Sequence, residues 1–179
     1  AGRGKIIEIL AQNSEKQFTL LELDKNFFDF LNNKFKSKNI KVLEERTQNI
    51  KENKFDTIFY LDVIEHIEDD KFELDTAYDL LKKNGHLVII VPAFQILFSK
   101  FDQKVGHFRR YRKRFFINYS KEKKLKIRKL AYFDFLGFFI ILFSKILNLT
   151  NSKKTTLGIK IWNFLIPISK MIDKITFHS

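Results

Sequence analysis

The sequence predicts an α/β protein with a doubly wound, mostly parallel sheet and a C-terminal helical elaboration. Over residues 1–91, short apolar runs alternate with amphipathic segments, which is typical of parallel strands covered by helices on both faces. The 179 residues suit one domain, and the 45% hydrophobic content suits a globular core rather than a disordered chain. We therefore expect a single domain over residues 1–179, in which residues 93–179 form a substrate-side lid and an apolar helical elaboration.

The expected strands are short apolar runs bounded by turn-forming or polar residues. Asn84 and Gly85 mark the turn that leads into the fourth run, and Pro92 ends it, because proline cannot continue a strand ladder. A fifth run follows the basic part of the chain. The five expected strands are Phe18–Leu21, Ile40–Leu43, Phe55–Leu61, His86–Val91 and Leu125–Tyr132.

Helices are expected where apolar residues recur at helical spacing. The first begins after Gly4, and a phenylalanine-rich helix separates the first two strands. Asp69 or Asp70 can N-cap a helix that continues to Leu81. After Pro92 we expect a loop or short-helix region over Ala93–Phe108, a basic helix over Arg109–Tyr119, and apolar segments over Phe133–Leu149 and Leu157–Ile175.

The net charge of +12 is concentrated in one segment. From Lys100 to Lys129 there are 13 Lys or Arg residues against two acidic ones, Asp102 and Glu122. A segment of this kind attracts partners that carry phosphate: nucleic acid, anionic lipid or a phosphorylated substrate. The charge alone leaves these three alternatives open.

A glycine turn and an acidic residue indicate a nucleotide site. Gly2 and Gly4 open a helix, where glycine permits close approach of a ligand and the helix N-terminus offers free N–H groups. Glu22 ends the next expected strand, where a carboxylate can accept hydrogen bonds from both ribose hydroxyls. Without the glycine turn, a plain surface charge would be the favoured interpretation of Glu22.

Four segments within residues 1–92 resemble, in order, those of class I S-adenosylmethionine (SAM)-dependent methyltransferases, and their co-occurrence is more specific than any one motif. The resemblance implies a Rossmann-like fold and SAM as cofactor. In this family one strand precedes the glycine loop and another completes the sheet, so we expect both to lie outside residues 1–179. The alternative is a Rossmann dehydrogenase, against which the Glu65-His66 turn argues. The segments are Ala1–Gly4 (glycine loop), Leu20–Asp24 (ribose-binding strand end), Phe55–Ile67 (fourth strand and L-E-H-I turn) and Leu81–Pro92 (an L-K-P-G-G-like turn into strand five).

The SAM contacts that the resemblance implies follow the chain from the glycine loop to the fourth strand. The methionine end is expected on the glycine loop, the ribose after the second strand of the family, the adenine after the third and the methyl-bearing sulfur after the fourth. The corresponding residues are Ala1, Gly2, Gly4, Glu22, Leu23, Thr47, Gln48, Asp62 and Val63.

Gly106 to Tyr111 is similar to the G-H-x-R-R-Y segment of a bacterial methyltransferase subgroup associated with surface-glycan or lipid-linked sugar pathways. This implies a small-molecule, glycan or lipid-linked acceptor, and Arg109, Arg110 and Tyr111 as substrate contacts. The guanidinium fork suits a phosphate or carboxylate, while the alternative is a solvated helix face. We expect nucleic acid not to be the acceptor, because no RNA-binding module is recognisable. An RNA methyltransferase and a non-catalytic nucleotide- or membrane-binding module remain as alternatives.

Methyl transfer from a sulfonium depends mainly on positioning, so little acid–base chemistry is obligatory. His66 and His107 are the candidate bases, since neutral imidazole accepts a proton near pH 7. For His66 we favour a structural hydrogen bond, and for His107 the two roles have equal weight. The spacing of Asp62, Glu65 and His66 also suits a divalent cation, but capping and cofactor contacts are favoured, and we expect no metal.

The apolar run from Phe135 to Phe143 is shorter than the roughly 20 residues that span a bilayer. Core packing is the default for such a helix. Together with the basic segment, however, the run favours peripheral contact with an anionic membrane. No targeting segment and no cysteine are present, so we expect a cytoplasmic protein at the inner membrane face.

Overall fold

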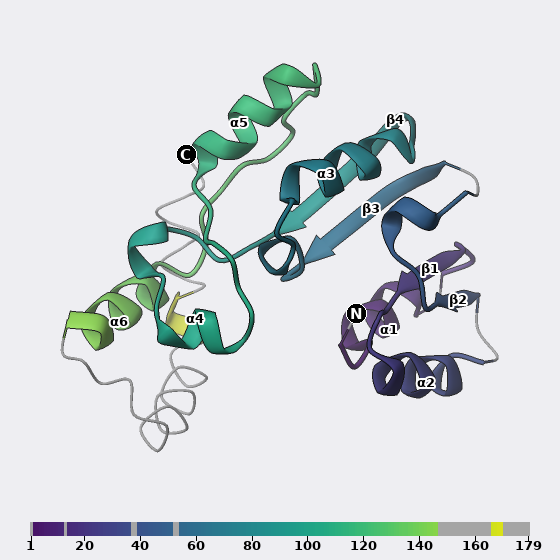
Figure 1. Cartoon of the computed structure of the whole chain (residues 1–179), viewed down its shortest axis with the longest axis horizontal. Helices are drawn as coiled ribbons and strands as arrows, with labels where there is room; N and C mark the ends of the chain where they lie inside the picture. The colour runs from purple at the N-terminus through teal and green to yellow at the C-terminus, as the bar shows by residue number, and fades with distance from the viewer. Residues whose placement is uncertain (1, 13, 37–38, 52–53, 147–165, 170–179) are drawn as a thin grey trace. The chain divides into compact units, whose positions relative to one another are not determined.

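The computed structural model describes residues 2–12, 14–36, 39–51, 54–146 and 166–169 (Figure 1). Helices alternate with parallel strands, so the predicted α/β class is confirmed. The chain divides into two compact units, one of Ala1–Ile58 with Lys71–Leu87 and the other of Phe59–Asp70 with Val88–Ser179. The predicted single domain with an elaboration over residues 93–179 stays a prediction.

The first unit opens with two helix–strand pairs built on a small apolar core. β1 pairs in parallel with β2, in a register that matches Phe18 with Ile40 and Leu21 with Leu43. Leu20, Leu31 and Phe35 lie in the core of this unit, and the Asp24 side chain caps the following helix by accepting from the Phe27 N–H at 3.0 Å. The elements are α1 (Lys5–Ala11), β1 (Phe18–Leu21), α2 (Lys25–Lys34), β2 (Ile40–Leu43) and the 3-10 turn η1 (Thr47–Asn49).

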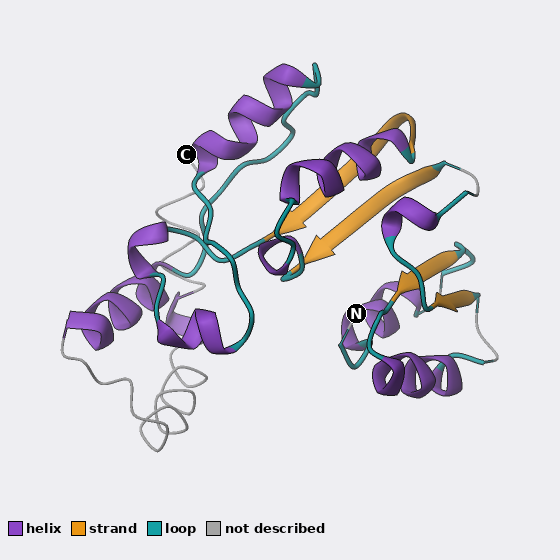
Figure 2. Cartoon of the chain, viewed as in Figure 1, coloured by secondary structure: helices purple, strands orange, loops and turns teal. Residues whose placement is uncertain are grey.

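A second two-stranded sheet is formed by β3 (Phe55–Leu61) and β4 (Leu81–Ile90), with α3 (Asp70–Asp79) between them in the chain. Figure 2 shows both strand arrows pointing the same way. Within α3, Leu74 and Ala77 are fully buried, as the helical spacing of apolar residues predicts. The strands β1, β2 and β3 have the same bounds as the first three strands predicted from the apolar runs.

β4 begins five residues earlier than predicted. The expected turn at Asn84 and Gly85 lies inside the strand, with Asn84 at a φ of 65°. A Cβ at Gly85 would lie 2.9 Å from the Lys82 carbonyl oxygen and 3.1 Å from that of Phe55. Glycine thus lets the neighbouring backbones approach closely while the strand continues.

Two further predictions in the basic part of the chain are wrong. The basic helix α5 spans Lys113–Glu122 and does not begin at Arg109, because Tyr111 is extended and forms a parallel bridge with Ala93. The segment Leu125–Tyr132 contains no strand, and most of its side chains are exposed. A segment forms a strand only where it can pair with the edge of a neighbouring strand. A local sequence pattern does not show whether such an edge is present.

The second unit also contains η2 (Ile64–His66), η3 (Gln95–Leu97), α4 (Lys100–Lys104) and α6 (Phe135–Ile146). α6 falls within the predicted apolar segment Phe133–Leu149, and Phe138 contacts the Phe94 ring with 4.9 Å between centroids. Of the segment Leu157–Ile175, only residues 166–169 are among those described, as part of a helix. Among the described residues, no helix combines the length and the apolar character needed to cross a membrane.

Candidate functional site

Each predicted SAM contact in the described chain lies in the glycine turn or just past the carboxyl end of a strand. Glu22 and Leu23 follow β1, Thr47 and Gln48 belong to η1 after β2, and Asp62 and Val63 follow β3. In open α/β sheets, ligands bind outside these strand ends. Ala1 lies outside the described residues, and the role of each remaining residue stays a prediction.

The two glycines of the turn before α1 have different surroundings. Both have left-handed backbone conformations, with φ of 56° at Gly2 and 69° at Gly4. A Cβ at Gly4 would lie 2.7 Å from Leu31 Cδ2 and 2.8 Å from Phe35 Cε2, so Gly4 is needed for packing against α2. At Gly2 no atom lies within 4 Å of a Cβ, and that side is open to a ligand.

Glu22 is held at the carboxyl end of β1. Its N–H donates to the Leu43 carbonyl at 3.0 Å, and its carboxylate accepts from the Asp24 N–H at 3.1 Å. An open hollow of about 350 Å³ in the same unit is lined by Arg3, Asn26, Phe27 and Phe30. A glycine turn with an open side and a half-buried strand-end carboxylate are suited to the methionine and ribose ends of SAM, so these residues fit the cofactor.

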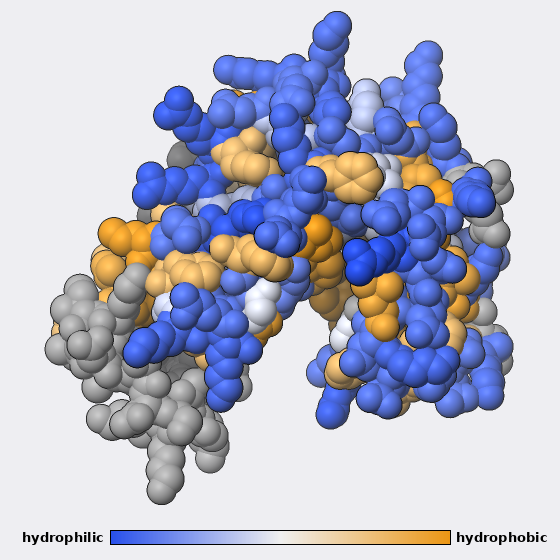
Figure 3. Space-filling model, in the orientation of Figure 1, coloured by the Kyte–Doolittle hydropathy of each residue, from blue (hydrophilic) through white to orange (hydrophobic). Residues whose placement is uncertain are grey.

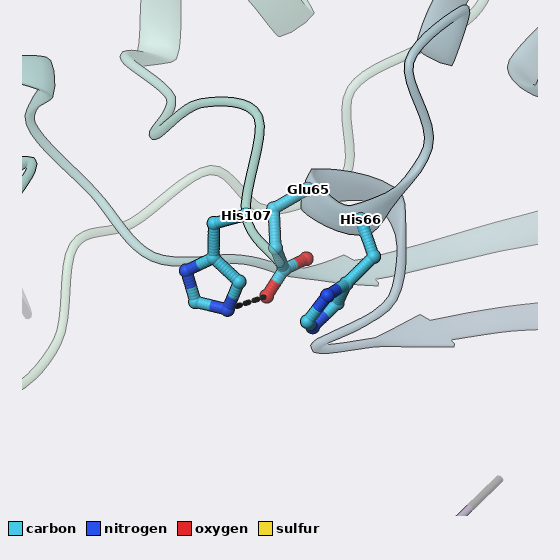
Figure 4. A group of neighbouring side chains, drawn as sticks. All are labelled: Glu65, His66 and His107. Atoms are coloured by element: carbon cyan, nitrogen blue, oxygen red, sulfur yellow. Dashed lines mark ion pairs between the residues drawn. The ribbon is translucent and has the colours of Figure 1, made fainter. Parts of the chain in front are cut away.

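A second group of polar residues lies wholly within the other unit, where Glu65 and His66 come from η2 and His107 follows α4 (Figure 4). His107 Nε2 lies 4.0 Å from Glu65 Oε1, and the two imidazole rings meet edge to face with 4.5 Å between centroids. Glu65 is fully buried, and desolvation raises the pKa of its carboxyl. Desolvation also lowers the pKa of His66, and the neighbouring His107 lowers it further.

Asp102 fixes the orientation of His107. Its Oδ1 lies 3.0 Å from His107 Nδ1 and accepts from Arg110 Nε at 2.8 Å, while Oδ2 accepts from a second Arg110 nitrogen and from Ser99. Burial alone would raise the pKa of Asp102, but hydrogen bonds from Arg110 and His107 hold it below its ordinary value. Because an ionised carboxylate only accepts, Nδ1 of His107 carries the proton and Nε2 faces Glu65.

Arg109 and Tyr111 fix the turn that carries Glu65. Arg109 pairs with Asp70 at 2.7 Å and donates to the carbonyls of Ile67 and Glu68 at 3.2 and 2.6 Å. The buried Tyr111 hydroxyl donates to Asp70 at 2.8 Å, and burial together with this bond raises its pKa far above the ordinary range. The predicted substrate contacts Arg109, Arg110 and Tyr111 are thus all bonded to residues of this chain, and their contact with a substrate stays a prediction.

Residues 1–89 match the family model described as a methyltransferase domain. They belong to this methyltransferase family. Its members use SAM, so the activity of the domain is SAM-dependent methyl transfer. No curated protein matches the chain significantly.

Two acidic residues of this methyltransferase, Asp70 and Asp102, are not singled out by the sequence. The local pattern indicates only a helix cap at Asp70 and a minor charge within a basic segment at Asp102. A signal for Asp102 was present, since Ser99-x-x-Asp102 has the spacing of a capping box, and the structure contains that box at the start of α4. No comparable local signal pairs Asp70 with Arg109, because the two are distant in sequence.

Proposed function

We propose that this methyltransferase transfers the methyl group of SAM to a hydroxyl of a small glycan or lipid-linked acceptor. The observation that carries the proposal is the cluster of Glu65, His66 and His107, which is built next to the carboxyl end of β3. The family resemblance puts the methyl-bearing sulfur beside that strand end. A hydroxyl must lose its proton when it is methylated, and a partly buried group of imidazoles and a carboxylate can take that proton.

The residues of the chain divide into cofactor contacts and positioning residues. In the proposal, the glycine turn holds the methionine end of SAM and Glu22 holds the ribose. The lowered pKa of His66 keeps its imidazole neutral near pH 7, the form that accepts a proton. Arg110 acts through Asp102 on His107, and Arg109 acts through the η2 turn.

A lipid-linked acceptor is supported by α6 and by the basic segment. Phe143 is 64% exposed and Phe139 is 49% exposed. Figure 3 shows apolar side chains, in orange, on the visible surface among the hydrophilic ones. Arg109 and Arg110 are engaged in ion pairs, but other basic side chains stay exposed and can meet an anionic headgroup. These exposed residues include Lys121, Lys124, Lys126, Arg128 and Lys129. The proposed location is therefore the cytoplasmic membrane face.

The test is transfer of a radiolabelled methyl group from SAM to three fractions: a lipid-linked saccharide extract, free sugar nucleotides and RNA. The proposal expects label in one of the saccharide fractions, and loss of that label in Glu22→Ala. Glu15→Ala, an exposed acidic position in the same unit, is the control and keeps the activity. Label only in RNA would contradict the acceptor class. No label in any fraction, with SAM bound, would contradict the proposed reaction.

A further inference from the structure

We propose that Glu65, His66 and His107 form a binding site for one divalent transition-metal ion. Each of the three offers one ligand atom, and these atoms all lie within 4.8 Å of one another. The sequence spacing suggests Asp62 as the third ligand beside Glu65 and His66, whereas the structure brings His107 to this place. The proposal thus departs from the expectation that the chain holds no metal.

The Glu65 carboxylate is buried with no hydrogen-bonded counter-charge among the described residues. Its side chain is 1% exposed, and neither carboxylate oxygen has a hydrogen-bond partner among the described residues. The nearest basic atom in an ion pair is His107 Nε2, at 4.0 Å. Burying a carboxylate without a partner is costly, so the site requires either a proton on Glu65 or a cation beside it.

The His107 imidazole is oriented as metal-bound imidazoles are oriented in other proteins. Such a histidine donates its second ring N–H to a carboxylate or a backbone carbonyl, which fixes the ring and its tautomer. His107 makes this contact with Asp102. Asp102 is in turn fixed by Arg110 and Ser99. His107 therefore keeps Nε2 for a ligand, and this nitrogen faces Glu65.

The three ligand atoms must move closer together before one ion can bind all of them. Ligand atoms about 2.1 Å from a tetrahedral metal lie about 3.4 Å from one another, so the widest separation must close by up to about 1.4 Å. Rotation of the exposed His66 side chain can supply this. Two imidazoles and one carboxylate favour Zn²⁺, Mn²⁺, Fe²⁺ or Co²⁺, whereas Ca²⁺ and Mg²⁺ prefer sites made of oxygen ligands.

Three protein ligands leave coordination positions open. An acceptor hydroxyl that occupied one of them would lose its proton more easily, because a cation lowers the pKa of a bound hydroxyl. This use of the ion rests on the proposed function, whereas binding of the ion does not.

The test is calorimetric titration of the chelator-treated protein with Zn²⁺, and separately with Mn²⁺, in the absence of SAM. We expect one site per chain. Affinity should fall by more than about a hundredfold in Glu65→Gln and in His66→Asn, because loss of a ligand costs more than the tenfold to hundredfold typical of a residue that only orients a ligand. The matched control is His86→Asn, since His86 is exposed on β4 outside the cluster. Co²⁺ gives a second readout, because its visible spectrum reports imidazole and carboxylate ligands directly.

Thermal unfolding followed by circular dichroism distinguishes loss of the ligand from loss of the fold. Wild type is expected to gain stability when Zn²⁺ is added, and a folded Glu65→Gln protein is expected to gain none. Two results would overturn the proposal: no saturable binding of these ions to folded wild type, or equal binding to wild type and Glu65→Gln. An infrared band of a protonated carboxylic acid, absent in Glu65→Gln, would then identify the proton as the compensating charge.

Discussion

The Asp102 carboxylate and the Arg110 guanidinium form a two-point ion pair that is almost completely removed from solvent. Arg110 donates from Nε to Oδ1 at 2.8 Å and from a terminal nitrogen to Oδ2 at 3.1 Å. The Arg110 side chain is 10% exposed and that of Asp102 is 0% exposed. The same carboxylate orients His107. One buried acid thus connects the basic G-H-F-R-R-Y segment to the cluster at the end of β3.

Replacing Asp102 by asparagine is expected to destabilise the protein strongly. The change leaves the buried Arg110 charge without its partner, and breaking a buried pair in this way costs about 3–5 kcal/mol. Urea unfolding of wild type and Asp102→Asn measures the difference. Asp29→Asn is the control, because Asp29 pairs with Lys25 at an exposed site, where loss of an ion pair has little effect on stability. Equal, small losses in both variants would show that the buried pair does not stabilise the fold.

The same carboxylate predicts a dependence of stability on pH. Since the folded-state pKa of Asp102 lies below its ordinary value of about 4, its contribution is fully present above that value. The contribution is lost as the pH falls through the folded-state pKa. The free energy of unfolding, measured from pH 6 downward, should therefore decrease on the acid side, and less steeply in Asp102→Asn. Parallel pH profiles for the two proteins would contradict this assignment.

The glycine turn gives a matched pair of substitutions. Gly2→Ala and Gly4→Ala each place a side chain at positive φ, which costs about 1–2 kcal/mol. Gly4→Ala also forces a Cβ against Leu31 and Phe35, and such overpacking typically adds about 1–3 kcal/mol. Thermal unfolding should therefore show the larger loss for Gly4→Ala. Equal losses would indicate that the turn does not pack against α2 as described.

Membrane contact is expected to depend on the exposed face of α6. Phe138 packs on Phe94, so the informative substitution is Phe139→Ser with Phe143→Ser, which leaves that contact in place. We expect this double variant to lose most co-sedimentation with anionic liposomes, because about 25 cal/mol is lost per Å² of apolar surface no longer buried. Phe72→Ser, an exposed phenylalanine on α3, should bind like wild type. Unchanged sedimentation of the double variant would exclude α6 as the membrane contact.

The part of the fold that follows local patterns could be predicted, and the part that depends on distant partners could not. The apolar runs of β1, β2 and β3 are continuous and bounded, so their positions follow from the sequence. The start of α5 does not, because Tyr111 is drawn into extended backbone by its bridge with Ala93. Helical spacing alone carries no information on that pairing.

In the candidate site, too, some residues follow from local sequence patterns and others depend on partners that are distant in the sequence. Gly2, Gly4 and Glu22 could be selected because a glycine turn and a strand-end acid are local features of known spacing. The sequence predicts the arginines of the basic segment as substrate contacts, because their acidic partners lie in other elements and are not visible in the local pattern. Only the folded chain shows that Arg109 and Arg110 are paired with Asp70 and Asp102.

The decisive test of the assigned cofactor site is calorimetric titration of wild type, Glu22→Ala and Glu15→Ala with SAM and S-adenosylhomocysteine. Saturable binding of both ligands is expected for wild type and for Glu15→Ala. Glu22→Ala should bind about tenfold to a hundredfold more weakly, because it loses charged hydrogen bonds to the ribose. Absence of binding to a folded wild-type protein, or equal affinity for Glu22→Ala, would contradict the assignment of this site to SAM.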